Sequence, residues 1–353
     1  MTFIIRSALF LTIFALLISW SHAFAAESTA WTIEGRTLPP PAAASEFLNR
    51  SISDTSQPNI ATSSQVPQTR EQWEEFVRAV DGARAVQFET LEQMAKVSIR
   101  QERIAGVNVY YITPDEISPE HSDHLFFHIH GGAYVIGGGD ASVTEAVQLA
   151  SSSGIRALSV DYRMPPFSPF PAAVDDTIAV YQEVLKTQEA GGIAIGGTSA
   201  GGGLAFAAIH QMKTLGLPIP GAIFAGTPWA DLTKTSDTLF TNEGIDRVLV
   251  TYDGLLKGAA ELYADGHNMK DPLISPLYGD FSGFPPTILI SGTRDLLLSD
   301  TVRSHRKLRE AGVVADLHVY EGMSHAGYLF GPNLPESASV FAEINQFLQR
   351  HLD

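Results

Sequence analysis

The sequence predicts an α/β fold in which a mostly parallel sheet is covered by helices on both faces. Short apolar runs, typical of buried strands, alternate with stretches of helical periodicity. A small-residue segment, residues 197–201 (GTSAG), follows one of these strands and precedes one of these helices. The 353 residues, 44% of them hydrophobic, suffice for one large domain with an appended cap.

The first 25 residues have the pattern of a secretory signal peptide. Arg6 precedes an almost wholly apolar run over residues 8–20, and small residues follow at Ala23 and Ala25. We therefore expect cleavage near Ala25, export to the periplasm or the medium, and no stable membrane insertion afterwards. An uncleaved anchor helix is the alternative, although the run is shorter than the ~20 residues that span a bilayer.

Residues 26–67 are rich in Ser, Thr, Pro and Ala and show no sustained periodicity, so we expect a loosely ordered lead-in. Residues 68–96 predict two cap helices. Thr69 and Gln72 have capping-box spacing at the start of the first. Its apolar stripe at i, i+3, i+4 and i+7 consists of Trp73, Phe76, Val77 and Val80. The second helix is expected over residues 84–94 and, with the first, could form part of a lid.

The alternation of strands and helices fills residues 97–353. Strands are expected over residues 97–104, 107–112, 125–130, 155–162, 193–195, 222–225, 287–290 and 317–320. Helices are expected over residues 141–151, 172–185, 200–213, 301–311 and 337–352. Residues 231–271 break the alternation, and we interpret them as a helical cap insertion over the carboxyl edge of the sheet.

Composition excludes several classes of partner and site. A net charge of −16 at pH 7 repels nucleic acid phosphates and anionic membranes, so neither is an expected partner. The chain has no cysteine, which excludes disulfides, thiolate metal sites and a Cys nucleophile.

The segment at residues 197–201 matches the G-x-S-x-G nucleophile elbow of the α/β-hydrolase fold, in the strand–turn–helix context that this motif requires. So sharp a turn needs tiny neighbours of Ser199, and Gly197, Ala200 and Gly201 meet that need. The alternatives are a phosphate-binding turn and a plain packing turn. The segment lacks a P-loop lysine and does not fit G-x-G-x-x-G with a later acidic residue.

A second motif, residues 130–133 (HGGA), follows a buried strand. Backbone N–H groups of Gly131, Gly132 and Ala133 can turn toward a reaction centre and, with the N–H of Ala200, form an oxyanion hole. Each such donor lowers the barrier by ~3–4 kcal/mol. Metal binding is the alternative, because His128 and His130 share a strand face. No further ligand residues cluster with them, so we expect no metal and interpret His130 as an anchor of this loop.

The remaining members of a triad follow from chain order, which on this fold runs Ser, acid, His. His325, after the last strand, is the expected general base, and Asp295, just past the strand over 287–290, the expected acid. Asp300 and Asp271 are competitors for the acid. We expect Asp271 to pin a turn instead.

Six motifs together resemble the bacterial hormone-sensitive-lipase family (family IV) of esterases, in order and from about residue 97 to the C-terminus. They are residues 130–134, 161–166, 170–176, 197–202, 271–276 and 292–295. Two residues depart from the usual pattern. Ala133 replaces the last Gly of H-G-G-G, and Thr198 stands where many members have Asp, which resembles the smaller Thr-type (GTSAG) branch. The charged residues resemble structural positions, so we expect an Asp–Arg network at the sheet edge from Asp161, Arg163, Asp175 and Asp176.

The resemblance implies a serine carboxylic-ester hydrolase, an esterase or lactonase, acting on short to medium acyl esters through an acyl-enzyme. Ser199, Asp295 and His325 would be its triad, and the chemistry requires no metal or organic cofactor. An amidase or deacetylase could use the same triad. A non-catalytic ligand-binding relative is the remaining alternative, although such relatives typically lack the histidine. The expected partner is a small ester or lactone, and the resemblance also allows a homodimer through the sheet edge.

Overall fold

The computed structural model of the chain describes residues 35, 37–84, 87–331 and 334–353. It divides into two units, Met1–Pro39 and Pro40–Asp353, and the description below concerns the second. The expected signal peptide over residues 1–25 lies outside the described residues.

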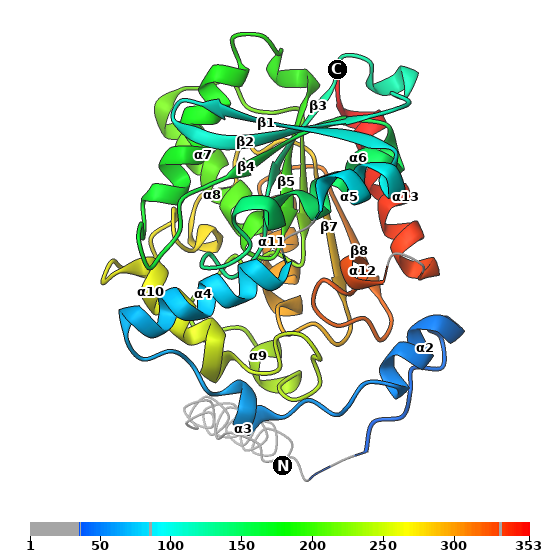
Figure 1. Ribbon diagram of the computed structural model, residues 1–353, viewed down its shortest axis with the longest axis vertical. Coiled ribbons are helices and arrows are strands. Elements are labelled where there is room, and N and C mark those ends of the chain that lie inside the picture. The colour runs from blue at the N-terminus through cyan, green and yellow to red at the C-terminus, as the bar shows by residue number, and fades with distance from the viewer. Residues whose placement is uncertain (1–34, 36, 85–86, 332–333) are drawn as a thin grey trace, which may run out of the picture. The chain divides into compact units, whose positions relative to one another are not determined.

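The second unit is built on a single eight-stranded sheet with the strand order β1-β2-β4-β3-β5-β6-β7-β8 (Figure 1). The strands are β1 (Val97–Ile104), β2 (Val107–Pro114), β3 (Leu125–Ile129), β4 (Arg156–Asp161), β5 (Ile193–Thr198), β6 (Ala222–Gly226), β7 (Thr287–Gly292) and β8 (Ala315–Tyr320). β2 pairs antiparallel with β1 and with β4, and β3 to β8 pair in parallel. The mostly parallel sheet predicted from the sequence is confirmed.

Helices cover both faces of this sheet. One face carries α6 (Thr144–Ser153) and α13 (Pro335–His351), and the other α7 (Ala172–Val184), α8 (Ala200–Leu215) and α11 (Leu298–Glu310); Figure 1 shows α6 and α13 on the opposite side from α7 and α8. β3, β5, β6 and β7 are buried throughout because they are covered on both faces. Short 3-10 helices occupy Pro119–His121, Gly139–Val143, Ala190–Gly192 and Pro276–Tyr278.

Among the described residues, the helices that precede the sheet are α2 (Glu46–Ser53), α3 (Ile60–Ser63), α4 (Arg70–Arg84) and α5 (Phe88–Ala95). The N–H of Gln72 donates to the Thr69 hydroxyl at 3.3 Å, which confirms the predicted start of α4. The Gln72 side chain, however, accepts from the N–H of Gln68, so the capping box is only half formed.

The expectation of a loosely ordered lead-in is corrected by α2 and α3. Side-chain oxygens of Ser45 and Asn59 accept the N–H groups of Leu48 and Thr62 and so begin these helices. Each helix is at most two turns long, too short for an apolar periodicity to show in the sequence.

The insertion over residues 231–271 consists of short helices joined by turns: α9 (Thr238–Thr241), a kinked turn (Tyr252–Leu256) and α10 (Lys257–Ala264). A further short helix, α12 (Gly327–Phe330), follows β8. None of the helices in the described part of the chain has the length and hydrophobicity needed to cross a membrane.

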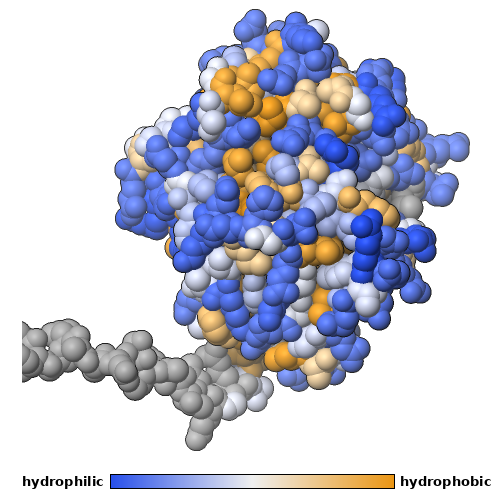
Figure 2. All heavy atoms as spheres, turned by 90° about the vertical axis from the view of Figure 1, so that its left-hand side faces the viewer, coloured by the Kyte–Doolittle hydropathy of each residue, from blue (hydrophilic) through white to orange (hydrophobic). Residues whose placement is uncertain are grey.

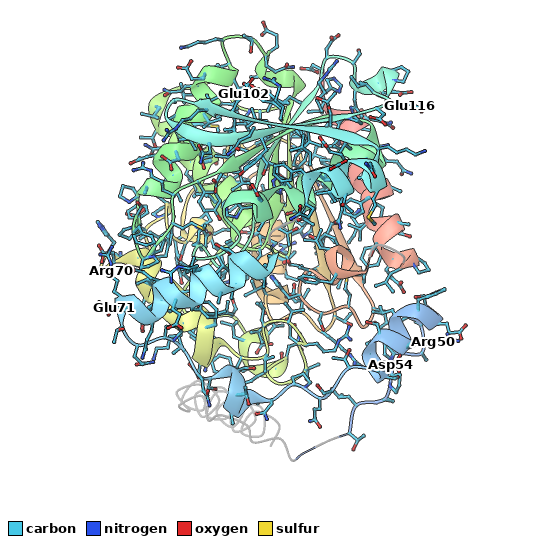
Figure 3. All side chains as sticks on the ribbon, viewed as in Figure 1. Arg50, Asp54, Arg70, Glu71, Glu102 and Glu116 are labelled. Carbon is cyan, nitrogen blue, oxygen red and sulfur yellow. The ribbon has the colours of Figure 1, made fainter. Side chains whose placement is uncertain are left out.

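Polar residues cover much of the surface in Figure 2. One face is mostly hydrophilic, with hydrophobic residues gathered toward its upper end (Figure 2). The charged side chains labelled in Figure 3 lie at the periphery of the second unit, on α2, α4, β1 and the segments next to α2 and β2.

Candidate active site

Ser199 lies on a sharp turn between β5 and α8. Its backbone has φ 62° and ψ −122°, a left-handed conformation that a residue with a side chain rarely adopts. Its N–H donates to the carbonyl of Gly226 at 2.7 Å, and its carbonyl accepts from Gly203 at 3.1 Å. The turn is therefore fixed by the neighbouring strand and by its own helix, as a nucleophile elbow requires.

The small residues around Ser199 are required by strand β3. A Cβ atom added to Gly197 would lie 1.9 Å from the carbonyl oxygen of Ile129, and one added to Gly201 would lie 2.0 Å from the same oxygen. Any side chain at either position would push β3 away from β5. The sequence argument for tiny flanking residues is thus confirmed by backbone packing.

Asp295 and His325 meet at the carboxyl ends of β7 and β8. Nδ1 of His325 lies 3.0 Å from Oδ1 of Asp295, and both side chains are buried. The carboxylate also accepts from the hydroxyl of Ser291 at 2.7 Å and from the N–H of Leu297 at 2.9 Å. Because the carboxylate is the acceptor, Nδ1 of His325 carries the proton and Nε2 is the basic nitrogen.

The pKa of His325 reflects two opposing effects. Burial alone favours the neutral imidazole, but the nearby carboxylates of Asp295 and Asp246 outweigh burial and raise the pKa of His325. The imidazolium that would form during proton transfer is therefore stabilised where it forms.

The two other candidates for the acid, Asp300 and Asp271, accept hydrogen bonds from backbone N–H groups away from His325. Asp300 is buried and accepts from the N–H groups of Ala230 and Asp231 at 3.0 and 2.9 Å, and burial raises its pKa to about 7. Asp271 accepts from the N–H of Leu273 at 2.9 Å and so pins a turn, as expected. Neither is bonded to His325.

The glycine loop after β3 takes conformations that favour glycine. Gly132 has φ 119°, and Ala133 has φ 54° although it carries a side chain. Within the described residues, the N–H groups of Gly132 and Ala133 donate to no protein acceptor. Gly131, Gly132 and Ala133 line the same pocket as Ser199, whereas Ala200 is fully buried at the start of α8, where its N–H has no partner within the helix.

The two histidines near this loop have separate partners. Nδ1 of His130 donates to the carbonyl of Gly131 at 2.8 Å, its ring stacks on Tyr162, and burial lowers its pKa to about 4. His128 instead contacts Ser159 and Glu145 at 2.8 and 3.1 Å. His130 thus anchors the loop as expected. Among the described residues no group of three or more His, Cys, Asp or Glu is arranged to hold a metal ion.

Ser199 and His325 open into a pocket of about 440 Å³, a size typical of small-molecule sites. Its walls are mostly apolar and come from Ile136, Val248, Leu249, Leu255, Leu256, Leu329 and Phe330. The pocket therefore joins a serine side chain on a strained turn, a buried histidine and free backbone donors to an apolar chamber.

Residues 126–329 match the α/β-hydrolase family model. The fold is similar to a crystal structure of the esterase E25, with 48% identity and a TM-score of 0.89 over 92% of this chain and 99% of that chain. A crystal structure of an esterase from the bacterial hormone-sensitive lipase family is 31% identical, with a TM-score of 0.71 over 88% of this chain and all of that chain. The chain belongs to the bacterial hormone-sensitive lipase family of α/β-hydrolases.

Two curated relatives have the names of an acetyl-hydrolase and an esterase. An acetyl-hydrolase of Streptomyces hygroscopicus is 32% identical over 69% of this chain and 81% of its own length. An esterase of Acinetobacter venetianus is 33% identical over 72% of this chain and 83% of its own. The protein is a carboxylesterase-type hydrolase.

Sequence reasoning missed a buried network beneath the elbow of this carboxylesterase. The carboxylate of Glu145 accepts the N–H of Thr198 at 3.2 Å and the Thr198 hydroxyl at 2.5 Å. Because the hydroxyl proton of Thr198 goes to Glu145, the hydroxyl of Tyr328 donates to Thr198, also at 2.5 Å. An acid within an amphipathic helix gives no signal of this kind in a sequence.

The predicted Asp–Arg network at the sheet edge is present in part: Arg163 pairs with Asp176, whereas Asp175 is exposed and Asp161 binds the segment after the glycine loop. Arg163 binds Asp176 through two nitrogens, and Asp161 accepts the N–H of Gly139 at 2.9 Å. Asp81 of α4 accepts the N–H of Gly137 at 2.7 Å. Carboxylates from both the sheet edge and the cap therefore fix the segment that follows Gly131–Ala133.

Proposed function

We propose that the chain hydrolyses esters of short to medium acyl chains, lactones included, through an acyl-enzyme formed on Ser199. The observation that carries the proposal is the 3.0 Å contact between His325 and Asp295 beside a pocket that contains Ser199 on its strained turn. The family supplies the reaction class, and this arrangement supplies the roles of the residues.

In the proposed mechanism, Nε2 of His325 takes the proton of Ser199 as the serine oxygen attacks the ester carbonyl. Asp295 holds the ring and stabilises its charge. N–H groups of Gly132, Ala133 and Ala200 stabilise the oxyanion. The alcohol leaves with the proton from His325. Water then attacks the acyl-enzyme with His325 again as base, which releases the acid and restores Ser199.

The substrate size follows from the pocket and from one relative. A chamber of about 440 Å³ with apolar walls suits a short or medium acyl chain. The related esterase EstE5, 25% identical with a TM-score of 0.74, was soaked with p-nitrophenyl butyrate in the crystal. We further assign the chain to the Thr-type branch, because the elbow has Thr198 where many members of the family have Asp.

The test is hydrolysis of p-nitrophenyl esters from acetate to palmitate by wild type and Ser199→Ala. Activity that peaks at short chains and vanishes in the variant supports the proposal. Activity that survives in Ser199→Ala contradicts it. Matched ester and amide substrates separate an esterase from an amidase or deacetylase, which would use the same triad.

The pH profile tests the base. His325 must be neutral to accept the Ser199 proton, and its carboxylate neighbours raise its pKa above the ordinary 6.5. We therefore expect kcat/KM to rise with pH through a single step centred above 6.5. A profile that is flat, or whose step lies below 6.5, is incompatible with His325 as the base.

We also propose that the chain is exported and cleaved near Ala25, on the basis of Arg6, the apolar run and the small residues at Ala23 and Ala25. Expression with a C-terminal tag and mass measurement of the exported protein would test this. A product that retains residues 1–25 contradicts it.

A further inference from the structure

The cap insertion contains a segment, residues 242–249, that contacts the loops of both the acid and the base. We call it the clamp segment. It follows α9 and ends just before the kinked turn at Tyr252–Leu256. The proposed mechanism gives it no role.

Asn242 begins the clamp segment and binds the turn that carries Asp295. Its Nδ2 donates to the carbonyl of Asp295 at 2.8 Å and to the carbonyl of Thr293 at 3.2 Å. One side chain thus bridges the acid itself and the residue two positions before it.

Asp246 binds the same turn through another of its peptide groups. It is fully buried, and its Oδ2 accepts the N–H of Leu296, the residue after the acid, at 2.8 Å. Its Oδ1 accepts from Val248 at 2.8 Å and Leu249 at 3.3 Å. A single carboxylate therefore joins the acid turn to two residues that line the substrate pocket.

The base loop is held by the same segment. The N–H of Arg247 donates to the hydroxyl of Ser324, the residue before His325, at 3.2 Å. Consecutive residues of the clamp segment, Asp246 and Arg247, thus contact the loops of the acid and of the base, which lie 30 residues apart in the sequence.

The clamp segment is itself tightly closed. The N–H of Gly244 donates to the carbonyl of Val250 at 2.8 Å, and the Thr251 hydroxyl donates to Glu243 at 2.6 Å. Val250 has φ 60°, a strained conformation for a β-branched residue that persists only where the surroundings enforce it. The clamp segment is therefore rigid enough to hold the loops of Asp295 and His325 in place, in addition to covering the site.

We propose that Asn242 and Asp246 are positioning residues for ester hydrolysis, which hold Asp295 and His325 in register and tie both to the pocket wall formed by Val248 and Leu249. This proposal rests on the proposed function of the triad. It assigns to the cap insertion a role in the geometry of the acid–base pair in addition to its role as a wall of the acyl pocket.

The charges around the pair give this proposal a measurable signature. Asp246 faces Asp295 and His325, with Arg247 of its own segment and Arg294 of the acid turn nearby. Burial and the charge of Asp295 raise the pKa of Asp246, and the charge of Asp246 in turn contributes to the raised pKa of His325. Removing that charge should lower the pKa of His325.

Two variants separate position from charge. Asn242→Ala removes the bonds to Asp295 and Thr293 without changing the charge, and Asn242 is only partly buried, so the variant should fold. Asp246→Asn removes the charge. It also leaves a single acceptor oxygen, so the N–H of Leu296 and those of Val248 and Leu249 can no longer all be bound. Asp253→Asn is the matched control, because this carboxylate of the same insertion is exposed and paired with Lys234.

The measurements are kcat, KM and the pH profile of p-nitrophenyl butyrate hydrolysis, with thermal melts to confirm folding. We expect Asn242→Ala to lower kcat about 10- to 100-fold with a smaller change in KM, since a displacement of about 1 Å at the reacting groups can cost ~10²-fold. We expect Asp246→Asn to shift the step in kcat/KM to lower pH. Asp253→Asn should match wild type in both.

The outcomes distinguish this proposal from the proposed function. If Ser199→Ala keeps its activity, the proposed function itself fails. If Ser199→Ala is inactive but folded Asn242→Ala has the kcat of wild type, the positioning role is overturned. An unshifted pH step in folded Asp246→Asn overturns the electrostatic role, and loss of activity in Asp253→Asn shows that the effect is not specific to the clamp segment.

Discussion

The proposed nucleophile and the proposed acid–base pair of this carboxylesterase are held by different combinations of contacts. Ser199 is fixed by backbone: its turn bonds to Gly226 and Gly203, and Gly197 and Gly201 pack directly against β3. Asp295 and His325 lie on loops beyond β7 and β8, where side-chain hydrogen bonds add to backbone bonds such as that from the N–H of Asp295 to the carbonyl of Gly292 at 3.1 Å.

The difference determines how far each half can be deduced from a sequence. The elbow depends on residues next to one another in the chain, so a five-residue motif encodes it. The acid turn depends on Asn242 and Asp246, about 50 residues away, which only the folded chain brings near. The same difference predicts different responses to substitution. Changes in the elbow should lower the stability of the fold, whereas changes around the acid–base pair should lower the rate of hydrolysis.

The largest expected effect is on the acid–base half. In Asp295→Asn an amide replaces the carboxylate that accepts the proton of Nδ1 of His325. The histidine can then carry its proton on Nε2 instead, and that nitrogen no longer acts as a base. We expect kcat to fall about 10⁴-fold with little change in the melting temperature. Asp271→Asn is the matched control, because Asn can keep the bond to Leu273 that pins its turn. Comparable losses in both variants would remove the distinction between Asp295 and a structural acid.

On the elbow half, Gly201→Ala should act through stability. The new Cβ would lie 2.0 Å from the backbone oxygen of Ile129, so β3 and α8 would have to separate. We expect a loss of about 3 kcal/mol in the free energy of unfolding, measured by urea denaturation. Gly82→Ala, in α4 with open space around its Cβ, should be neutral or slightly stabilising. If Gly201→Ala is as stable as wild type, the close contact between residue 201 and β3 does not hold the elbow.

The sequence predicted the fold well because its evidence is periodic. Each strand of the parallel sheet was placed to within a few residues, since apolar runs buried on both faces are distinctive. The start of α4 was readable from Thr69. The two short helices α2 and α3 were not, because their caps at Ser45 and Asn59 are single residues without a following pattern.

The candidate site was predicted unevenly for the same reason. Ser199, Asp295 and His325 are brought together by the order of the strands, and the structure places the last two in contact. Glu145, Asp246 and Asn242 carry no motif. Their importance lies in partners that are distant in the chain, so composition and spacing could not distinguish them from surface polar residues.

A smaller effect is expected beneath the elbow. Thr198→Val keeps the shape of the side chain but leaves Glu145 and Tyr328 each without one buried hydrogen bond. We expect a loss of about 2 kcal/mol in unfolding free energy and a moderate fall in kcat. Thr198→Ser should restore both, because it keeps the hydroxyl. If Thr198→Val is as stable and active as wild type, the elbow is held by its backbone alone, which would sharpen the contrast with the acid–base pair.

The smallest effect concerns a carboxylate of α4 that contacts the segment after the glycine loop. Asp81 of α4 accepts the N–H of Gly137, and burial raises the pKa of its carboxyl group. Asp81→Ala should lower kcat about fivefold, since one hydrogen bond contributes about 1 kcal/mol. Asp81→Asn should keep most of the activity because its amide oxygen still accepts, and Glu75→Ala, exposed on the same helix, is the control. Equal rates in Asp81→Ala and wild type would mean that the sheet-edge bond from Asp161 to Gly139 suffices, and that the glycine loop, like the elbow, is set by the α/β domain without the cap.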